Sequence, residues 1–531
     1  MIKCLVILLF SVAALYSQDD KSGNPNVELP DFVITGQDVI YIKQAKKIEP
    51  DFISTITEDF VKPEYPSDEL DLRELSNPIK ENLDLLETGQ YFRGSLYGGA
   101  GLYVTPEAGL SYKYPFSNGI LNTGFGGVYQ RAYIDNSERY SLNGGASIDY
   151  TIGINEDALA GTRFLLSGDY NSSSYKLFSS SIPATKRTKN EGNYLLGIKN
   201  TTGRVFIFDL YVQDNFTSIV EDNFTENLIS TGGFAKLQLS DIGIGIKSKY
   251  IKQFVKSDSL GNVDYDYVLI RPVISFELFN SVMVGAGYSF TKSGTQTFNN
   301  VYASFGLRIY KDMILLGEFN PGAELITSGS LLRENDYFSA TTFTNLFFRK
   351  SNALSVSVKY EYEKYFQIDA GVKYFKSGNF PYYALSNLSG QFKFESADVE
   401  SYNAYINLLF HLGPYGFLYG DLVYTRIRDK NSNNIPYKPE IKSNVTYGYE
   451  LTDGFLSEVS LKLNYYSYAD IANTIKLNSF VDLGLKFTYK MNDQFILNLK
   501  LSNIFNRKIY YWQGYEEKPF DLIAGFNLLF D

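Results

Sequence analysis

The sequence is poor in the residue types that most often carry chemistry. Its 531 residues include one cysteine, one histidine and one tryptophan. Cys4 precedes an apolar run at the N-terminus, so a chain that loses this run has no cysteine left for a disulfide or a thiol nucleophile. His411 is the only imidazole, which excludes a Cys/His metal cluster and any Ser/His/Asp triad away from that position. Since the carboxylates form no pair that differs from a polar strand face, we expect no enzymatic activity, no cofactor and no metal site.

Excess positive charge and long apolar runs are also missing. The net charge of −10 argues against nucleic acid as a partner. No stretch reaches the ~20 consecutive apolar residues that a helix needs to span a bilayer. The N-terminus does carry a short apolar run, Leu5 to Tyr16, which follows Lys3 and precedes small or polar residues. This pattern predicts a cleaved signal peptide at residues 1–18 and export from the cytoplasm.

Aromatic residues and glycine are plentiful instead, with 44 Tyr, 40 Phe and 43 Gly. From residue 91 onward, apolar and polar residues alternate over many segments, for example Leu354 to Tyr362, Phe366 to Tyr374 and Phe520 to Phe530. A strand turns alternate side chains to opposite faces, and repeated amphipathic strands of about 9–12 residues are typical of a membrane barrel. We therefore predict an all-β fold, a transmembrane outer-membrane antiparallel β-barrel of about 22–24 strands at residues 91–531.

The connections between these segments alternate in length. A barrel of this class has short periplasmic turns at one end and longer external loops at the other. The predicted short turns are residues 200–203, 240–241, 279–281, 310–312, 349–352, 413–416, 452–454 and 492–493. The predicted long loops are residues 171–192, 257–263, 320–336, 428–439, 470–477 and 503–519. One strand face then meets lipid, and the other forms a hydrated inner wall with charges of both signs at Lys359, Glu361, Asp369, Lys373, Asp482, Lys486 and Lys500.

Residues 19–90 differ from the rest because they are rich in proline and acidic residues. We interpret them as a short, irregular periplasmic segment with little core of its own. Within it, Glu28 to Gly36 forms a short apolar strand candidate, and Asn77 with Pro78 predicts the start of a short helix.

The last hairpin carries a more specific set of residues. Asn503-Ile-Phe-Asn-Arg-Lys508 precedes an aromatic stretch, Tyr510 to Tyr515, and then the closing strand Phe520 to Phe530. In this order the three segments resemble the C-terminal end of TonB-dependent receptors. The resemblance covers roughly Pro436 to Asp531, and Ile504 stands where leucine is usual. It implies a cell outer membrane location and transport or binding of an unidentified solute.

The resemblance also extends to the N-terminal segment. Residues 28–36 look like the TonB box, the short stretch that recruits the energising protein TonB, with Asp31, Phe32, Val33, Ile34 and Thr35 as candidate contacts. These receptors carry a plug domain between that box and the barrel, yet the segment here has no glycine between Gln37 and Thr88. We therefore expect the plug to be absent or severely truncated. An occluder is then expected from loops 171–192 and 320–336 folding inward, from residues 19–90, or from a partner protein.

Two functions remain open at this point. The first is a receptor-like barrel that transports or binds a solute, with Tyr510, Tyr511, Trp512 and Tyr515 as candidate surface-loop ligand contacts. The second is a plugless structural barrel or pore that works with a periplasmic or surface protein. The expected partners are outer-membrane lipid, the barrel-assembly machinery, and TonB, a surface lipoprotein or a periplasmic protein.

Overall fold

The computed structural model describes residues 92–152, 160–181, 184–200, 205–279, 281–362, 366–386 and 389–531. The predicted signal peptide, segment 19–90 and the TonB-box-like stretch with Asp31, Phe32, Val33, Ile34 and Thr35 lie outside these residues. They stay predictions.

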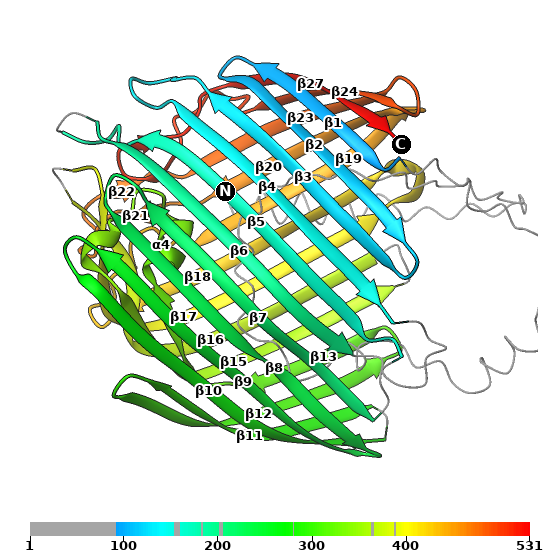
Figure 1. Cartoon of the computed structure of the whole chain (residues 1–531), viewed down its shortest axis with the longest axis vertical. Coiled ribbons are helices and arrows are strands. Elements are labelled where there is room, and N and C mark those ends of the chain that lie inside the picture. Colours follow the sequence, from blue (N-terminus) through cyan, green and yellow to red (C-terminus); the bar gives the residue numbers. More distant parts are fainter. Residues whose placement is uncertain are drawn as a thin grey trace, which may run out of the picture.

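The described chain forms a closed antiparallel β-barrel (Figure 1). One sheet holds 23 strands, and its first strand, β1 (Gly94–Gly101), pairs with β2 on one side and with the last strand, β27 (Asp521–Phe530), on the other. The strands β13 and β14 follow one another along the same neighbour, β15, so the wall is 22 strands around. The predicted all-β barrel of about 22–24 strands is confirmed.

Apart from β13 and β14, which both pair with β15, each wall strand pairs with the next wall strand along the chain. Their bounds are β2 (Val104–Phe116), β3 (Gly119–Gln130), β4 (Arg139–Thr151), β5 (Arg163–Lys176), β6 (Lys186–Asn200), β7 (Phe206–Ile219), β8 (Phe224–Leu239), β9 (Ile242–Ser257), β10 (Gly261–Leu278), β11 (Val282–Ser293), β12 (Gln296–Tyr310), β13 (Met313–Phe319), β14 (Gly322–Thr327), β15 (Asn345–Tyr362), β16 (Phe366–Leu385), β17 (Phe392–His411), β18 (Phe417–Asp429), β19 (Ile441–Thr452), β20 (Phe455–Asn464), β23 (Phe480–Lys490) and β24 (Phe495–Ser502).

The alternation of the sequence becomes the two faces of this wall. Apolar side chains at every second position point outward and are strongly exposed, such as Leu196 at 56% and Val372 at 56%. The residues between them point inward, and Asp369 accepts a hydrogen bond there from the Tyr405 hydroxyl at 3.3 Å. Because closure pairs every strand, the outer face offers only side chains to its surroundings.

The two ends of the barrel differ. At one end, which we call the turn end, Ser240 and Asp241 alone link β8 to β9, and Gly94 lies opposite Phe530. A short 3₁₀ turn, η2 (Gly413–Tyr415), links β17 to β18. At the other end of the barrel, which we call the loop end, long hairpins project and carry further elements. These are α4 (Ser328–Glu334), η1 (Ala340–Thr342) and two small sheets, β21 (Ser467–Tyr468) with β22 (Lys476–Leu477) and β25 (Tyr510–Trp512) with β26 (Tyr515–Glu516). In the described part of the chain, no helix has the length and apolar character needed to cross a membrane.

Three of the predicted connections are wrong. The predicted turn 349–352 lies inside β15, where the pairing with β16 shifts register between Ser351 and Leu354 and Asn352 has φ 50°. The polar residues of this β-bulge have the same composition as a turn, which is why a turn was predicted there. Most of the predicted loop 171–192 is strand, since β5 and β6 pair from Arg163 with Lys199 to Lys176 with Lys186. The predicted loop 257–263 is a tight connection between β9 and β10.

Candidate functional site

The hairpin of β14 and β15 ends in a long connection, residues 328–344, which we call the strap. It begins with α4, whose first turn is capped reciprocally by Thr327 and Ser330. Leu331 and Leu332 on this helix are 5% and 0% exposed. Polar contacts of the strap reach β4, β6, β8 and β9 on one side, and on the other side the Tyr383 hydroxyl of β16 donates to the Leu331 carbonyl. The strap therefore crosses the mouth of the barrel at the loop end (Figure 1).

One end of the strap is held by Glu226, near the start of β8. This residue is 2% exposed. Its Oε1 accepts hydrogen bonds from Thr327 Oγ1 at 2.8 Å and from the Gly329 backbone N–H at 3.1 Å. Its Oε2 accepts one from Gln253 Nε2 at 2.9 Å, and Asn345 Nδ2 donates to Gln253 Oε1 at 2.9 Å. A buried carboxylate needs such donors in place of water, so these bonds fix the start of α4 to the wall.

The tip of the strap, midway between its two chain ends, is held by Asp336, and we call this the Asp336 end. Its Oδ2 lies 2.7 Å from Arg139 Nη1, and its Oδ1 lies 2.7 Å from Lys189 Nζ. The two cations come from β4 and β6. Each carboxylate oxygen therefore pairs with a separate cation, as in a specific carboxylate-binding site.

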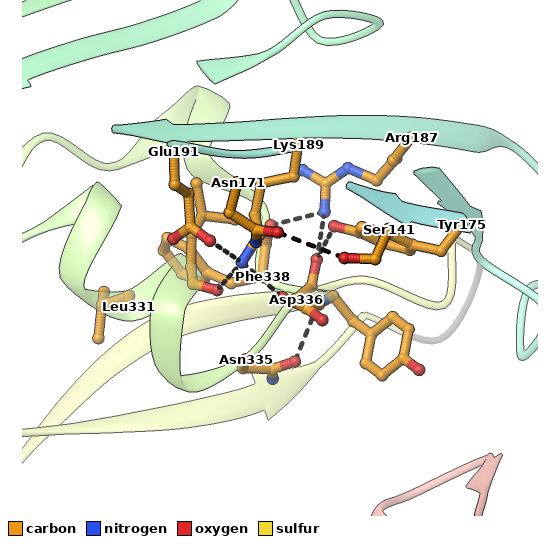
Figure 2. Close-up of polar contacts among 12 residues, drawn as sticks. Ser141, Asn171, Tyr175, Arg187, Lys189, Glu191, Leu331, Asn335, Asp336 and Phe338 are labelled. Atoms are coloured by element: carbon orange, nitrogen blue, oxygen red, sulfur yellow. Dashed lines mark hydrogen bonds and ion pairs between the residues drawn. The ribbon is translucent and has the colours of Figure 1, made fainter. Parts of the chain in front are cut away.

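The backbone next to Asp336 is held as well. Arg187 Nη1 donates to the carbonyl oxygens of Asp336 and Phe338, both at 3.0 Å, and the Tyr175 hydroxyl also donates to the Asp336 carbonyl. Figure 2 shows Arg187, Lys189 and Tyr175 reaching from the strands toward the strap. We call Arg139, Arg187 and Lys189 the cation cluster. Its Arg187 side chain is 0% exposed and also pairs with Asp222.

The charges set the protonation state of this anchor. Burial alone would raise the pKa of Asp336, but Arg139 and Lys189 together hold the pKa well below its usual range. Asp336 is therefore ionised at neutral pH, and its stabilising effect on the docked strap is complete above the usual aspartate pKa of about 3.9.

A core of aromatic and aliphatic side chains fills the space between the strap and the other loops. Tyr515 is 2% exposed, stacks on Tyr337 of the strap with ring centroids 3.5 Å apart, and donates a hydrogen bond to the Gly390 carbonyl at 2.6 Å. Further members of this core come from several loops and strand ends: Phe178, Leu331, Leu332, Phe338, Tyr383, Phe392, Tyr437, Ala469 and Leu477. We call the strap and the loops that meet it here the lid.

The four predicted ligand contacts lie in or beside this core. Trp512 contacts Tyr383 at 5.1 Å and Tyr437 at 4.9 Å between ring centroids. Tyr510 packs against the same core and donates to Glu516 at 2.7 Å, a bond that raises the pKa of Tyr510 to about 12. Tyr511 is 40% exposed. Trp512 and Tyr515 thus build the lid, Tyr511 faces solvent, and a ligand role for any of the four stays a prediction.

A cavity of about 180 Å³ opens beside the lid core. Tyr382, Tyr383, Glu395, Asp470 and Gln513 contribute to its lining. Glu395 accepts from the Tyr382 hydroxyl at 2.7 Å, and Asp470 accepts from the Ile475 N–H at 2.7 Å. The lining therefore offers tyrosine rings and polar groups to a small polar solute. Among the residues that the structure describes, no three His, Cys, Asp or Glu side chains are grouped to hold a metal ion.

The residues that position the strap were missed from the sequence. Arg187, Lys189 and Glu191 alternate with small and polar residues, as in a strand, but they lie in a stretch that was predicted as a loop. The inward loop 320–336 was predicted, and the structure places residues 328–336 across the mouth. No local pattern marks Glu226, because its partners follow it by about a hundred positions.

Comparison with known proteins agrees with this architecture. No family model matches the chain, and no curated protein matches it in sequence. Solved structures do match in shape: the FrpB iron transporter from Neisseria meningitidis has a TM-score of 0.62 and 12% identity over 83% of this chain and 82% of that one. The pyoverdine outer membrane receptor FpvA from Pseudomonas aeruginosa has a TM-score of 0.59 and 10% identity over 83% and 79%. The copper transporter OprC has a TM-score of 0.59 and 10% identity over 82% and 80%. At these identities the likeness shows a shared fold, the 22-strand barrel of outer-membrane receptors.

Proposed function

We propose that this chain is an outer-membrane barrel, similar to TonB-dependent receptors, that binds or transports a solute at the cell surface. The observation that carries the proposal is the closed 22-strand wall with a packed lid across one mouth. The similar solved structures are transporters and receptors for iron, pyoverdine and copper, not enzymes. In this proposal the loop end faces outward, the turn end faces the periplasm, and the exposed apolar belt contacts lipid.

The N-terminal part of the proposal rests on the sequence. Residues 1–18 act as the signal peptide, residues 19–90 lie in the periplasm, and residues 28–36 engage TonB through Asp31 to Thr35. Because segment 19–90 is short and lacks glycine over most of its length, the plug is proposed to be absent or truncated. The lid supplies the obstruction instead. Insertion of the barrel requires the assembly machinery.

The location and the channel are tested separately. Fractionation should place the protein in the outer membrane, with a heat-dependent shift on a denaturing gel. In planar bilayers the full-length protein should show little conductance, and a variant with residues 328–344 replaced by a short Gly/Ser linker should show a larger one. A large and steady conductance of the unmodified protein would rule out an intrinsic occluder.

The alternative is a structural barrel that works with a partner protein. The acid-rich segment 19–90 favours it, since such a segment offers an extended surface to another protein. Affinity purification of the full chain and of a variant without residues 19–90 separates the two proposals. Loss of a co-purifying envelope protein favours the scaffold. Loss of TonB alone, which a variant of Asp31 to Thr35 should reproduce, favours the receptor.

A further inference from the structure

The strap is anchored differently at its start, by Glu226, and at its tip, by Asp336. At the Glu226 end, both carboxylate oxygens have donors from the strap or the wall. At the Asp336 end, three buried polar atoms have no hydrogen-bond partner within the part of the chain that the structure describes: Arg187 Nε, Glu191 Oε1 and Asn335 Nδ2. The contact at Glu226 is complete, whereas the contact at Asp336 leaves groups of the wall and the strap unpaired. The second contact is therefore the end from which the strap can separate.

The wall carries the cations of this contact, and the strap carries only the carboxylate. Arg139 belongs to β4 and Lys189 to β6, and both strands are held by their own ladders without the strap. Tyr175 lies under the Arg139 guanidinium, 5.3 Å from its carbon to the ring centroid, and orients it. The receptor for the carboxylate is thus part of the rigid wall.

The charge balance shows what remains when Asp336 leaves. Lys189 keeps Glu191 at 2.9 Å, and Arg187 keeps Asp222. Among the described residues, Asp336 alone forms an ion pair with Arg139. Departure of the strap would therefore leave one uncompensated cation on the inner wall at the mouth, beside a lysine and a tyrosine hydroxyl.

From this geometry we infer that Arg139 and Lys189 form a carboxylate-binding site, which the chain's own Asp336 fills. The strap is an internal ligand for a site that also accepts a carboxylate-bearing solute. Such a solute competes with Asp336 and releases the Asp336 end of the strap, while Glu226 retains the start of α4. This inference deepens the proposed function and rests on it, because it names the solute class and the contact that opens the lid.

The single tryptophan provides the measurement. Trp512 belongs to the lid core, together with Leu331, Leu332 and Phe338 of the strap. Release of the strap should raise quenching of its fluorescence by acrylamide. Trypsin cleavage after Arg333, followed by mass spectrometry, is a second readout that does not use the tryptophan.

The first test empties the site. In Asp336→Ala, the quenching constant of Trp512 should rise about twofold or more, and added acetate should return it toward the wild-type value. Equal concentrations of chloride or of methylammonium chloride should not. The double variant Asp336→Ala/Arg139→Gln should show the same loosening without rescue by acetate. Glu334→Gln is the matched control, because it removes a charge from the same strap and breaks the ion pair with Lys438, while its amide oxygen can still accept from the Tyr383 hydroxyl.

The second test uses the unmodified protein. Succinate should raise both Trp512 quenching and cleavage after Arg333 in a saturable way, and sodium chloride of equal ionic strength should not. Arg139→Gln should abolish this dependence. Rescue of Asp336→Ala by chloride, acetate rescue that persists without Arg139, or no response to either carboxylate would overturn the inference. None of these readouts requires transport, so a silent bilayer recording would count against the proposed function and not against the carboxylate site.

Discussion

Removal of the Glu226 carboxylate should free the start of the strap from the wall. The substitution Glu226→Ala deletes an acceptor that is 2% exposed and has three donors, from Thr327, Gly329 and Gln253. A hydrogen bond to a charged group contributes about 1.5–3 kcal/mol, and each buried donor left unpaired adds a similar cost. Such terms are not additive, and the wild-type carboxylate carries its own burial cost. We therefore expect Glu226→Ala to destabilise the docked strap, relative to the undocked strap, by about 4 kcal/mol in total.

That free energy converts to a factor of about 10³ in the ratio of docked to undocked strap, because each 1.4 kcal/mol is about tenfold. Hydrogen exchange with mass spectrometry measures this ratio directly through the backbone amides of residues 328–344. In Glu226→Ala these amides should exchange about a thousandfold faster at the same pH, whereas the ladder amides of β8 should remain protected.

A further variant, Glu226→Gln, separates the hydrogen bonds of this side chain from its charge. In Glu226→Gln the amide oxygen still accepts from Thr327 and Gly329. Its NH₂ group, however, faces the Gln253 NH₂, whose own carbonyl is already bonded to Asn345. This variant should lie between the wild type and Glu226→Ala.

Glu221→Ala is the matched control on the same hairpin. Glu221 accepts hydrogen bonds from Thr188 on the exposed side of the wall. Its removal should leave strap exchange unchanged. If strap amides exchange equally fast in the wild type and in Glu226→Ala, the assignment of Glu226 as the fixed end is wrong.

Three other outcomes follow from the same structure. Tyr515→Ala loses the stacked ring and the bond to the Gly390 carbonyl, so the lid should be destabilised by about 3–5 kcal/mol, with a red shift of Trp512 emission. Because the pKa of Asp336 is lowered, Trp512 quenching in the Glu226→Gln background, where Glu226 cannot titrate, should be constant from pH 7 to about pH 5 and should rise only below about pH 4, as Asp336 gains its proton. Leu196→Arg on the outer face should reduce the folding free energy in vesicles by about 2–4 kcal/mol, whereas Leu195→Arg, at the next position and on the inner face, should cost much less.

The wall strands could be predicted because the pattern that defines each strand lies within a few consecutive residues. Alternation along Leu354 to Tyr362 assigns both a strand and its outward apolar face, and the same rule holds for Phe520 to Phe530, which pairs with β24 and β1. The rule failed where polar residues fulfil another role. Ser351 and Asn352 form a bulge in β15, and the serines and asparagines of β5 and β6 belong to a hairpin that projects beyond the apolar belt. In both places the local composition of a turn or loop is compatible with continued pairing.

The lid was not predictable because its contacts are not local. Tyr510 to Tyr515 were correctly singled out as a distinctive aromatic loop, but an aromatic loop in water and an aromatic core under a strap have the same composition. Only the position of Tyr337 and Phe392, which arrive from distant hairpins, decides between them. Asp336 likewise looks like an ordinary loop acid until β4 and β6 place two cations beside it.

The strap combines two kinds of contact, and each supplies what the other lacks. Burial of Leu331, Leu332 and Phe338 is favourable but non-directional, so alone it would allow the strap to rest in several positions across a wide mouth. Glu226 and the cation cluster are directional, and they lie at separate points of the wall, so together they fix one position and one register. Buried charged groups contribute little net stability when paired. Left unpaired, however, they raise the free energy of any other docking position of the strap. A strap held in this way is closed by its apolar residues, while Asp336 on the strap and Glu226 on the wall determine where it docks. A competing carboxylate is therefore a suitable signal for release at the Asp336 end.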